Sequence, residues 1–282
     1  MNSANTRDLV PTVLMSLMAL VVAGTFFWII GNIFWQGFQS LSWDFLFTAP
    51  EDAGRAGGIY PILVSTAWII GICLGISFPL GLGTAILLAE FSHQFPKVRR
   101  SVEWSLDILA GVPSIVFGLF GNVFFAKVLG LGFSILSGGL TLACMVLPIL
   151  IRAIQQSLNN IPQQDRRAAS ALGISKRSTF WVLLLPAAMP GVVVGLLLGL
   201  GRAIAETAAL IFTSGYVDRM PRSMWDSGRS LSIHIYDLAM NVSGGEPNAY
   251  ATATVLITLL IITNTTVATL GLWFRDQRLQ RL

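Results

Sequence analysis

Two charged residues of opposite sign lie four positions apart inside a long apolar run of the chain. Arg202 and Glu206 belong to the run at about residues 181–213. A charge inside a membrane-spanning helix costs about 2.5 to 3.5 kcal/mol on insertion scales, so it needs a partner or a water-filled cavity. On a continuous helix the two residues can form an i,i+4 ion pair. Alternatively, Arg202 faces a translocation path and binds an anion while Glu206 holds its side chain, because a guanidinium fork suits phosphate-like oxygens.

Other groups that could do chemistry are scarce. The sequence contains no P-loop, GxxxxGK followed by Ser or Thr, so the chain is not itself a P-loop ATPase. Its two histidines, His93 and His234, fall on opposite sides of the topology predicted below and cannot share a metal. Cys73 and Cys144 lie in apolar runs as small packing residues. The sequence therefore predicts a chain that is not an enzyme and that holds no metal or cofactor.

The composition places the chain in a membrane. Apolar residues make up 54% and charged residues only 11% of the 282 residues, whereas charged residues are about a quarter of a soluble domain. Each of six apolar runs is near or above the roughly 20 residues that cross a bilayer. We therefore predict an all-α polytopic membrane protein with six transmembrane helices, at about residues 10–32, 60–90, 103–128, 133–155, 181–213 and 250–274.

The distribution of Lys and Arg between the runs predicts the topology. With a cytoplasmic N-terminus, the inner side holds twelve of these residues and the outer side five, which is a clear positive-inside bias. Both termini and the segment at about 156–180 are then cytoplasmic. The outer segments are about 33–59 and 214–249, and SLSIHIYDLAM in the second is expected to form a short surface helix.

A polar segment precedes the fifth run and has the composition of a short helix closed by a glycine. Its residues are Asp165, Arg166, Arg167, Ala168, Ala169, Ser170, Ala171, Leu172 and Gly173. The run that follows carries Gly191, Gly195 and Gly199 at intervals of four. Such a stripe predicts close helix packing, and the same smooth face would also permit this helix to move against its neighbours.

The polar segment resembles the EAA loop of permease subunits in bacterial ABC importers. The matching residues are Ala168, Ala169, Gly173, Leu183, Leu185 and Pro186, while Arg167 stands where that family usually has Glu. Three further segments look like the A-type permease of the bacterial high-affinity phosphate importer, over about residues 57–214. They are GGIYPILVSTAWIIGICLGISFPLGLGTAILLAEF, AGVPSIVFGLFG and GLGRAIAETAALIFTSG.

This resemblance implies a type I ABC importer permease fold in the bacterial inner membrane. The first transmembrane helix and outer loop would occupy 1–56, the permease core 57–274 and a cytoplasmic tail 275–282. A coupling helix at about Gln163–Leu172 would dock on an ATP-hydrolysing subunit, and Pro113, Pro186 and Pro190 would mark kinks or helix ends.

The implied function is import of inorganic phosphate by alternating access, with Arg202 attracting the anion in transit. The implied partners are a homologous C-type permease, two copies of an ATP-binding subunit that holds ATP and Mg, a periplasmic phosphate-binding protein and membrane lipid. Nucleic acid is not expected, since membrane orientation accounts for the net charge of +4.

Other functions are compatible with the same residues. The cargo can be another oxyanion, such as molybdate, sulfate or phosphonate, because the binding protein selects it before this chain meets it. An ion-coupled secondary transporter would keep the six spans and the charged pair but would work without an ATP-binding subunit. A membrane subunit that only signals phosphate status through the ATPase would assemble without transporting.

Overall fold

The computed structural model describes residues 6–91 and 95–279 and is helical almost throughout. A small antiparallel hairpin pairs β1 (Pro50–Glu51) with β2 (Ala56–Gly57). Within the described residues, five helices are long and apolar enough to cross a membrane, and the count rises to six if a bent pair of helices is taken as one span. The prediction of an all-α polytopic membrane protein is confirmed.

The spans follow the predicted apolar runs. They are α1 (Thr6–Ser40), α3 (Tyr60–Ile86) with η2 (Leu87–Phe91), α6 (Ile135–Asn159), η5 (Thr179–Leu184) with α9 (Leu185–Ile204), and α12 (Glu246–Leu279). The third span is broken: α4 (Pro96–Gly111) is followed by α5 (Ser114–Gly121) and η4 (Asn122–Val128) at a bend of 104°. Val112 at the bend is extended, because the next residue is Pro113 and a proline disfavours the helical conformation just before it.

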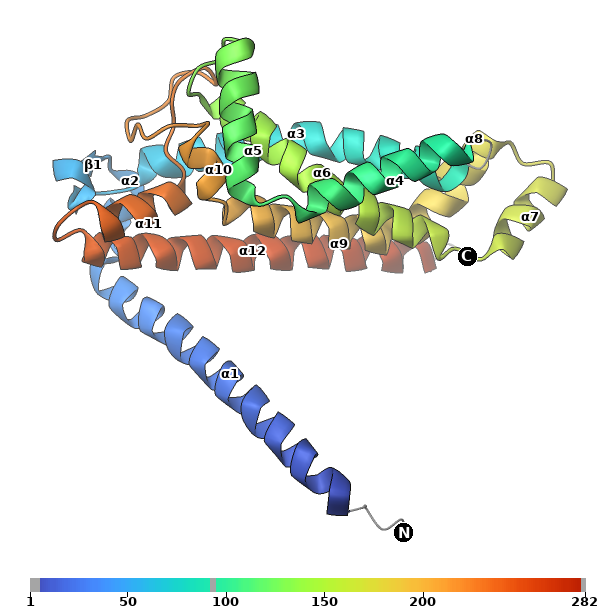
Figure 1. The fold of residues 1–282 in the computed structure, drawn as a ribbon, viewed down its shortest axis with the longest axis horizontal. Helices are drawn as coiled ribbons and strands as arrows, with labels where there is room; N and C mark the ends of the chain where they lie inside the picture. The colour runs from blue at the N-terminus through green and yellow to red at the C-terminus, as the bar shows by residue number, and fades with distance from the viewer. Residues whose placement is uncertain (1–5, 92–94, 280–282) are drawn as a thin grey trace.

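The short elements gather at the two ends of the bundle (Figure 1). One end holds α2 (Trp43–Phe47), the hairpin with its turn η1 (Asp52–Gly54), α10 (Ala208–Ile211) and α11 (Leu231–Met240). The other end holds α7 (Gln163–Ala171), α8 (Lys176–Ser178), the start of α4 and the last turns of α12. The predicted helix at about 163–172 is α7. The short elements that connect the spans therefore lie at opposite ends of the bundle.

The core is built around α6. Two-thirds of its most apolar window is buried inside the chain, which is more than for any of the other four unbroken spans in the described residues. Its fully buried side chains include Leu142, Leu150 and Ile154. They pack between α3 on one side and α9 on the other, so these three helices form the rigid centre of the fold.

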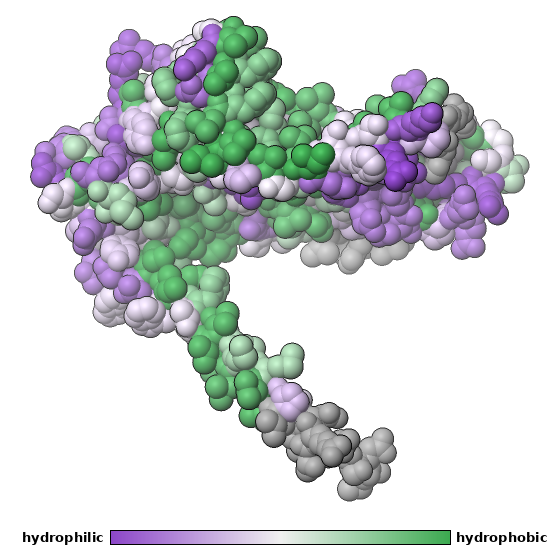
Figure 2. Space-filling view, viewed as in Figure 1, coloured by the Kyte–Doolittle hydropathy of each residue, from purple (hydrophilic) through white to green (hydrophobic). Residues whose placement is uncertain are grey.

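By contrast, α1 leans away from the bundle as a separate arm (Figure 1). The C-terminal part of α1 contacts α12, where the Thr254 hydroxyl of α12 donates to the carbonyl of Ile33 in α1 at 3.2 Å. Further along the arm its large apolar side chains are exposed and form a continuous hydrophobic surface (Figure 2). An apolar helix with this exposure requires lipid or another subunit around it.

Two predicted elements differ from the structure. The run at 181–213 was expected to be one helix, but α9 ends at Ile204 and a separate short helix, α10, follows after a break. The segment SLSIHIYDLAM does form a helix, α11, but one face of it is buried rather than on the surface, including Leu231, Ile233 and His234.

Candidate translocation and coupling sites

Arg202 lies in the last turn of α9, immediately before the break. Its side chain is exposed, although it sits in an otherwise apolar span. Within the part of the chain that the structure describes, Arg202 makes no side-chain hydrogen bond and no ion pair. A guanidinium in this position has all five N–H donors available to an incoming anion.

Glu206 does not pair with Arg202, so the ion pair that the sequence left open does not form, and Glu206 does not hold the Arg202 side chain as the alternative interpretation expects. The backbone leaves the helix at Ala205, and residues four apart across such a break no longer share a face. Instead, the carboxylate of Glu206 accepts a hydrogen bond from the backbone N–H of Ala209 at 3.1 Å. Glu206 is 8% exposed and acts as a side-chain cap for the start of α10, where backbone N–H groups favour negative charge.

The break is held in place by contacts from other elements. The carbonyl of Glu206 accepts from the hydroxyl of Ser232 on α11 at 2.6 Å, and the carbonyl of Phe212 accepts from the amide of Asn122 at 2.7 Å. A Cβ atom on Gly118 of α5 would lie 2.8 Å from the Cα of Ala209, so the backbones of α5 and α10 meet directly. Arg202 is therefore presented at a fixed backbone position while its side chain stays free to move.

The glycine stripe on α9 packs against α6. A Cβ atom added to Gly191 would lie 2.1 Å from the Cβ of Ser157, and one on Gly199 would lie 2.7 Å from a methyl group of Val146. At Gly195 the nearest atom is the Cβ of Ala153, at 3.1 Å. The three glycines therefore allow the two helices to approach closely, as the spacing predicts.

At the opposite end, α7 presents most of the predicted coupling residues outward. Arg167, Ala168, Ser170, Ala171, Leu172 and Gly173 are exposed, and Asp165 is half-buried. Leu172, the residue that follows α7, is 78% exposed. Arg167 makes only a local hydrogen bond to Gln163, at 3.3 Å, so its charge remains available to a partner.

Two members of the predicted coupling set face their own chain instead. Ala169 is buried, and Arg166 forms an ion pair with Glu90 at the end of the second span. Sequence reasoning missed Glu90. The only signal for it was a single acidic residue closing a long apolar run.

Gly173 ends α7 in the left-handed conformation, with φ +70°. Proline cannot adopt this angle, because its ring fixes φ near −65°, and a misplaced proline costs about 3 kcal/mol. We expect Gly173→Pro to displace Leu172 and the end of α7, and to lower substrate-stimulated ATP hydrolysis by at least about tenfold in the reconstituted transporter. The measurement is ATPase activity with and without substrate.

The matched control is Gly173→Asn, since asparagine tolerates a positive φ far better than other residues. It is expected to keep most of the stimulation. Normal stimulation in the Gly173→Pro protein would contradict a coupling role for this end of α7.

A polar network joins α4 to α6, and sequence reasoning did not identify it. Arg152 of α6 pairs with Asp107 and donates to the carbonyl of Glu103 at 2.8 Å. The carboxylate of Glu103 in turn accepts from Gln155 and from Arg99, both at 2.9 Å. These are charges inside or at the edge of apolar runs, which is the same signal that singled out Arg202. The network holds the inner half of the broken span against the central helix.

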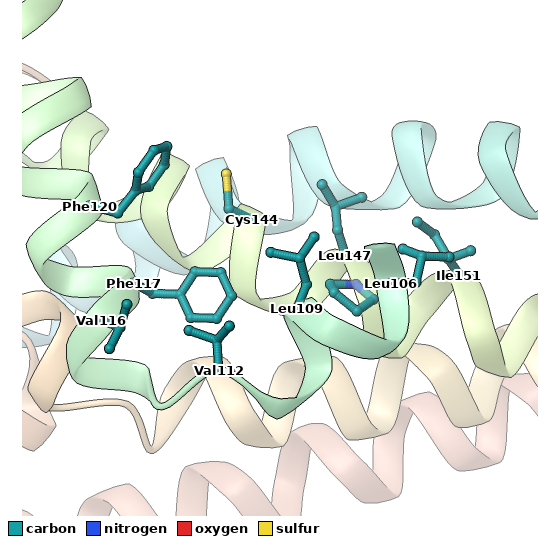
Figure 3. A pocket seen from close by; sticks show the side chains of 10 residues that line it. Leu106, Leu109, Val112, Val116, Phe117, Phe120, Cys144, Leu147 and Ile151 are labelled. Carbon is teal, nitrogen blue, oxygen red and sulfur yellow. The ribbon is translucent and has the colours of Figure 1, made fainter. Parts of the chain in front are cut away.

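An apolar groove opens beside this network, where the bent span crosses α6 (Figure 3). It has a volume of about 460 Å³ and is lined by side chains such as Leu109, Phe117, Phe120 and Leu147. Its lining is apolar apart from the thiol of Cys144, which is only a weak hydrogen-bond donor. The groove is therefore suited to apolar contact.

His234 is buried on the inner face of α11. Burial, together with the positive charge of Arg229, lowers the pKa of His234 to about 4. The Nη1 atom of Arg229 pairs with Asp237 at 3.0 Å and lies 3.3 Å from Nδ1 of His234. His234 is thus neutral at pH 7 and belongs to a structural cluster. No group of three His, Cys, Asp or Glu residues suited to a metal occurs in the described part of the chain, and His93 lies outside it.

Comparison with protein families assigns the chain. Residues 78–271 match the family described as binding-protein-dependent transport system inner membrane component, and this match covers more than half of the sequence. The chain belongs to this family. It is an integral membrane protein and a permease subunit of an ABC transporter, as its helices and its EAA-type segment predict.

Its relatives within this permease family include proteins named for phosphate transport. The chain is 30% identical over 273 residues to the probable ABC transporter permease protein YqgI of Bacillus subtilis, covering 91% of this chain and 90% of that one. It is 38% identical over 192 residues to the phosphate transport system permease protein PstA homolog of Mycoplasma pneumoniae, covering 66% of this chain. That match spans only 28% of the longer relative. Over 161 residues it is 37% identical to phosphate transport system permease protein PstA 1 of Mycobacterium tuberculosis, covering 57% of this chain and 52% of that one.

Solved permease structures confirm the fold. A bacterial ABC transporter involved in import of the acidic polysaccharide alginate matches with a TM-score of 0.65 and 14% identity, over 94% of this chain and 97% of that one. The MetNI methionine ABC transporter in inward-facing conformations matches with a TM-score of 0.57 and 19% identity, over 78% and 94%. At these identities the likeness concerns the fold alone, and the predicted importer permease architecture is correct.

Proposed function

We propose that the chain is the membrane-spanning permease subunit of an ATP-driven importer that moves inorganic phosphate from the periplasm to the cytoplasm of a bacterium. Relatives named as phosphate transport permeases support the choice of cargo. The structural observation that carries the proposal is Arg202, an exposed guanidinium at a helix break inside an apolar span. A planar fork of donors is well suited to the oxygens of a phosphate ion.

The proposed complex contains this chain, a homologous C-type permease, two copies of an ATP-binding subunit that holds ATP and Mg, and a periplasmic phosphate-binding protein. The exposed apolar arm α1 supports a further membrane subunit, because a second permease would cover its hydrophobic surface. The exposed residues of α7 support docking of an ATP-binding subunit at that end. The excess of Lys and Arg on the α7 side supports cytoplasmic N- and C-termini.

In this proposal transport proceeds by alternating access. Closure of the ATP-binding subunits pushes α7, and the helices connected to it open the cavity between the two permeases toward the periplasm. Phosphate released by the binding protein meets Arg202 near the outer end of the fifth span. Hydrolysis and product release by the partner then return the cavity to its cytoplasm-facing state.

Copurification and proteoliposome uptake test the proposal together. The chain is expected to copurify with an ATP-binding subunit. In vesicles whose ATP-binding subunits face the lumen, the reconstituted complex is expected to accumulate radiolabelled phosphate in the lumen. This accumulation should occur only when ATP is enclosed in the lumen. Uptake driven by an ion gradient in the purified chain alone would establish a secondary transporter instead.

Substrate competition separates the remaining alternatives. Excess unlabelled phosphate should abolish uptake, while molybdate, sulfate and phosphonate should leave it largely intact when the matching phosphate-binding protein is present. Preferential uptake of one of these oxyanions would reassign the cargo. A complex that assembles and hydrolyses ATP but moves no anion would indicate a signalling subunit.

A further inference from the structure

The contacts of Arg166 differ from those of a residue that docks on a partner. It lies on α7, yet its side chain points back into its own chain and is only 24% exposed, while that of Glu90 is 18% exposed. Its Nη1 atom pairs with Glu90 in η2, at the inner end of the second span. Its Nη2 atom donates to the carbonyl of Leu158 at 2.7 Å, in the last turn of α6. One guanidinium therefore joins three elements.

Both contacts suit the positive charge. The pair with Glu90 is partly shielded from water, so salt screens it less than a pair on an open surface. The carbonyl of Leu158 lies in the last turn of α6, where it accepts a long backbone hydrogen bond from Ile161, at 3.3 Å, and where the helix dipole favours a cation. A lysine in this position has no planar fork to make both contacts at once.

The rest of α7 is loosely seated. Figure 1 shows this helix standing off from the ends of the neighbouring helices. A cavity of about 190 Å³ lies between α7 and η5, and the Arg166–Glu90 pair forms part of its wall together with Ser170, Ile174, Thr179, Phe180 and Leu184. A helix that rests on a cavity can rock unless a specific side-chain contact fixes it.

We propose that Arg166 is the positioning residue that transmits the movement of α7 to α3 and α6. Arg167, the next residue, faces outward and serves the partner, so two adjacent arginines divide the two tasks. Since α3 and α6 form the centre of the fold, a push on α7 is passed directly to the helices around the transport cavity. This inference rests on the proposed function and specifies how its coupling helix works.

The test uses a distance that does not depend on the cargo. Spin labels are placed at the exposed positions 80 on α3 and 164 on α7, in the complete complex with Cys73 and Cys144 replaced by serine. With Arg166 present, the distance distribution between the labels is expected to stay the same in nucleotide-free and ATP-bound states. Arg166→Gln is expected to broaden it and to make it change with nucleotide, whereas Arg167→Gln should leave it as narrow as in the parent protein.

Transport supplies the second readout. Arg166→Gln is expected to lower phosphate moved per ATP hydrolysed by about tenfold, while the ATP-binding subunit still copurifies. The double variant Arg166→Glu with Glu90→Arg should restore a large part of this ratio, because it rebuilds the ion pair with the charges exchanged. The recovery should be incomplete, because the contact to the Leu158 carbonyl is not rebuilt. An unchanged distance distribution in the Arg166→Gln protein would overturn the proposal. It would also be overturned if the Arg166→Gln protein no longer copurified with the ATP-binding subunit and the double variant with exchanged charges did not recover transport. Failure of the parent complex to move phosphate would overturn the assigned cargo and leave the distance result to decide the role of Arg166.

Discussion

Arg202→Gln is expected to lower phosphate uptake by at least about tenfold, because a hydrogen bond to a charged group is worth about 1.5 to 3 kcal/mol. Its guanidinium is exposed and has no hydrogen-bond or ion-pair partner among the described side chains, so its removal breaks no contact of the fold. The amount of chain in the membrane and its assembly with partners should therefore be unchanged. Initial uptake rates in cells that express equal amounts of the two proteins provide the measurement.

Arg202→Lys separates charge from geometry. Lysine keeps the positive charge but lacks the planar fork, so an intermediate rate is expected if paired hydrogen bonds to the anion matter. The carboxylate of Glu206 caps α10 and does not touch Arg202, so the effect of Arg202→Gln does not involve a lost contact to Glu206. Normal uptake by a fully inserted Arg202→Gln protein would remove Arg202 from the translocation path.

The second large effect is expected at Gly191, where even one methyl group has no room. A Cβ atom there would lie 2.1 Å from the Cβ of Ser157 and 2.9 Å from the carbonyl oxygen of Ala153. Overpacking of this kind costs about 1 to 3 kcal/mol, occasionally more, because helices must separate or side chains must leave their rotamers. Gly191→Ala should therefore lower the thermal unfolding temperature of the purified chain and the yield of folded protein.

Gly201→Ala is the matched control on the same helix. A Cβ atom at this position meets nothing within 4 Å, so the substitution adds a methyl group without a clash. Alanine also favours a helix over glycine by about 1 kcal/mol, which both variants share. Equal unfolding temperatures for the two variants would show that the α6–α9 contact does not limit stability.

The sequence predicts the spans and the coupling helix well, because each depends on local signals. Apolar length alone locates the membrane helices, and Pro113 marks the bend in the third span. The polar composition between two apolar runs, closed by Gly173, identifies α7 with nearly its observed bounds. The glycine spacing on α9 likewise predicts close packing without reference to the partner helix.

The break between Arg202 and Glu206 could not be predicted from local propensity. Residues 202–208 include no glycine or proline, and alanine and glutamate favour helices. The break is imposed by tertiary contacts, since α10 is held against α5 at Gly118 and by Asn122. The inward direction of Arg166 has a similar origin, because a short polar helix gives no sign of which face its own chain will cover.

The most direct test of the central claim is uptake of radiolabelled phosphate at sub-micromolar concentration by cells that lack only this chain, with the chain restored as control. The proposed function predicts that high-affinity uptake disappears in its absence and returns with it, and that it returns weakly with the Arg202→Gln variant. Unchanged phosphate uptake in the deleted cells, together with loss of molybdate, sulfate or phosphonate uptake in the same assay, would contradict the assignment.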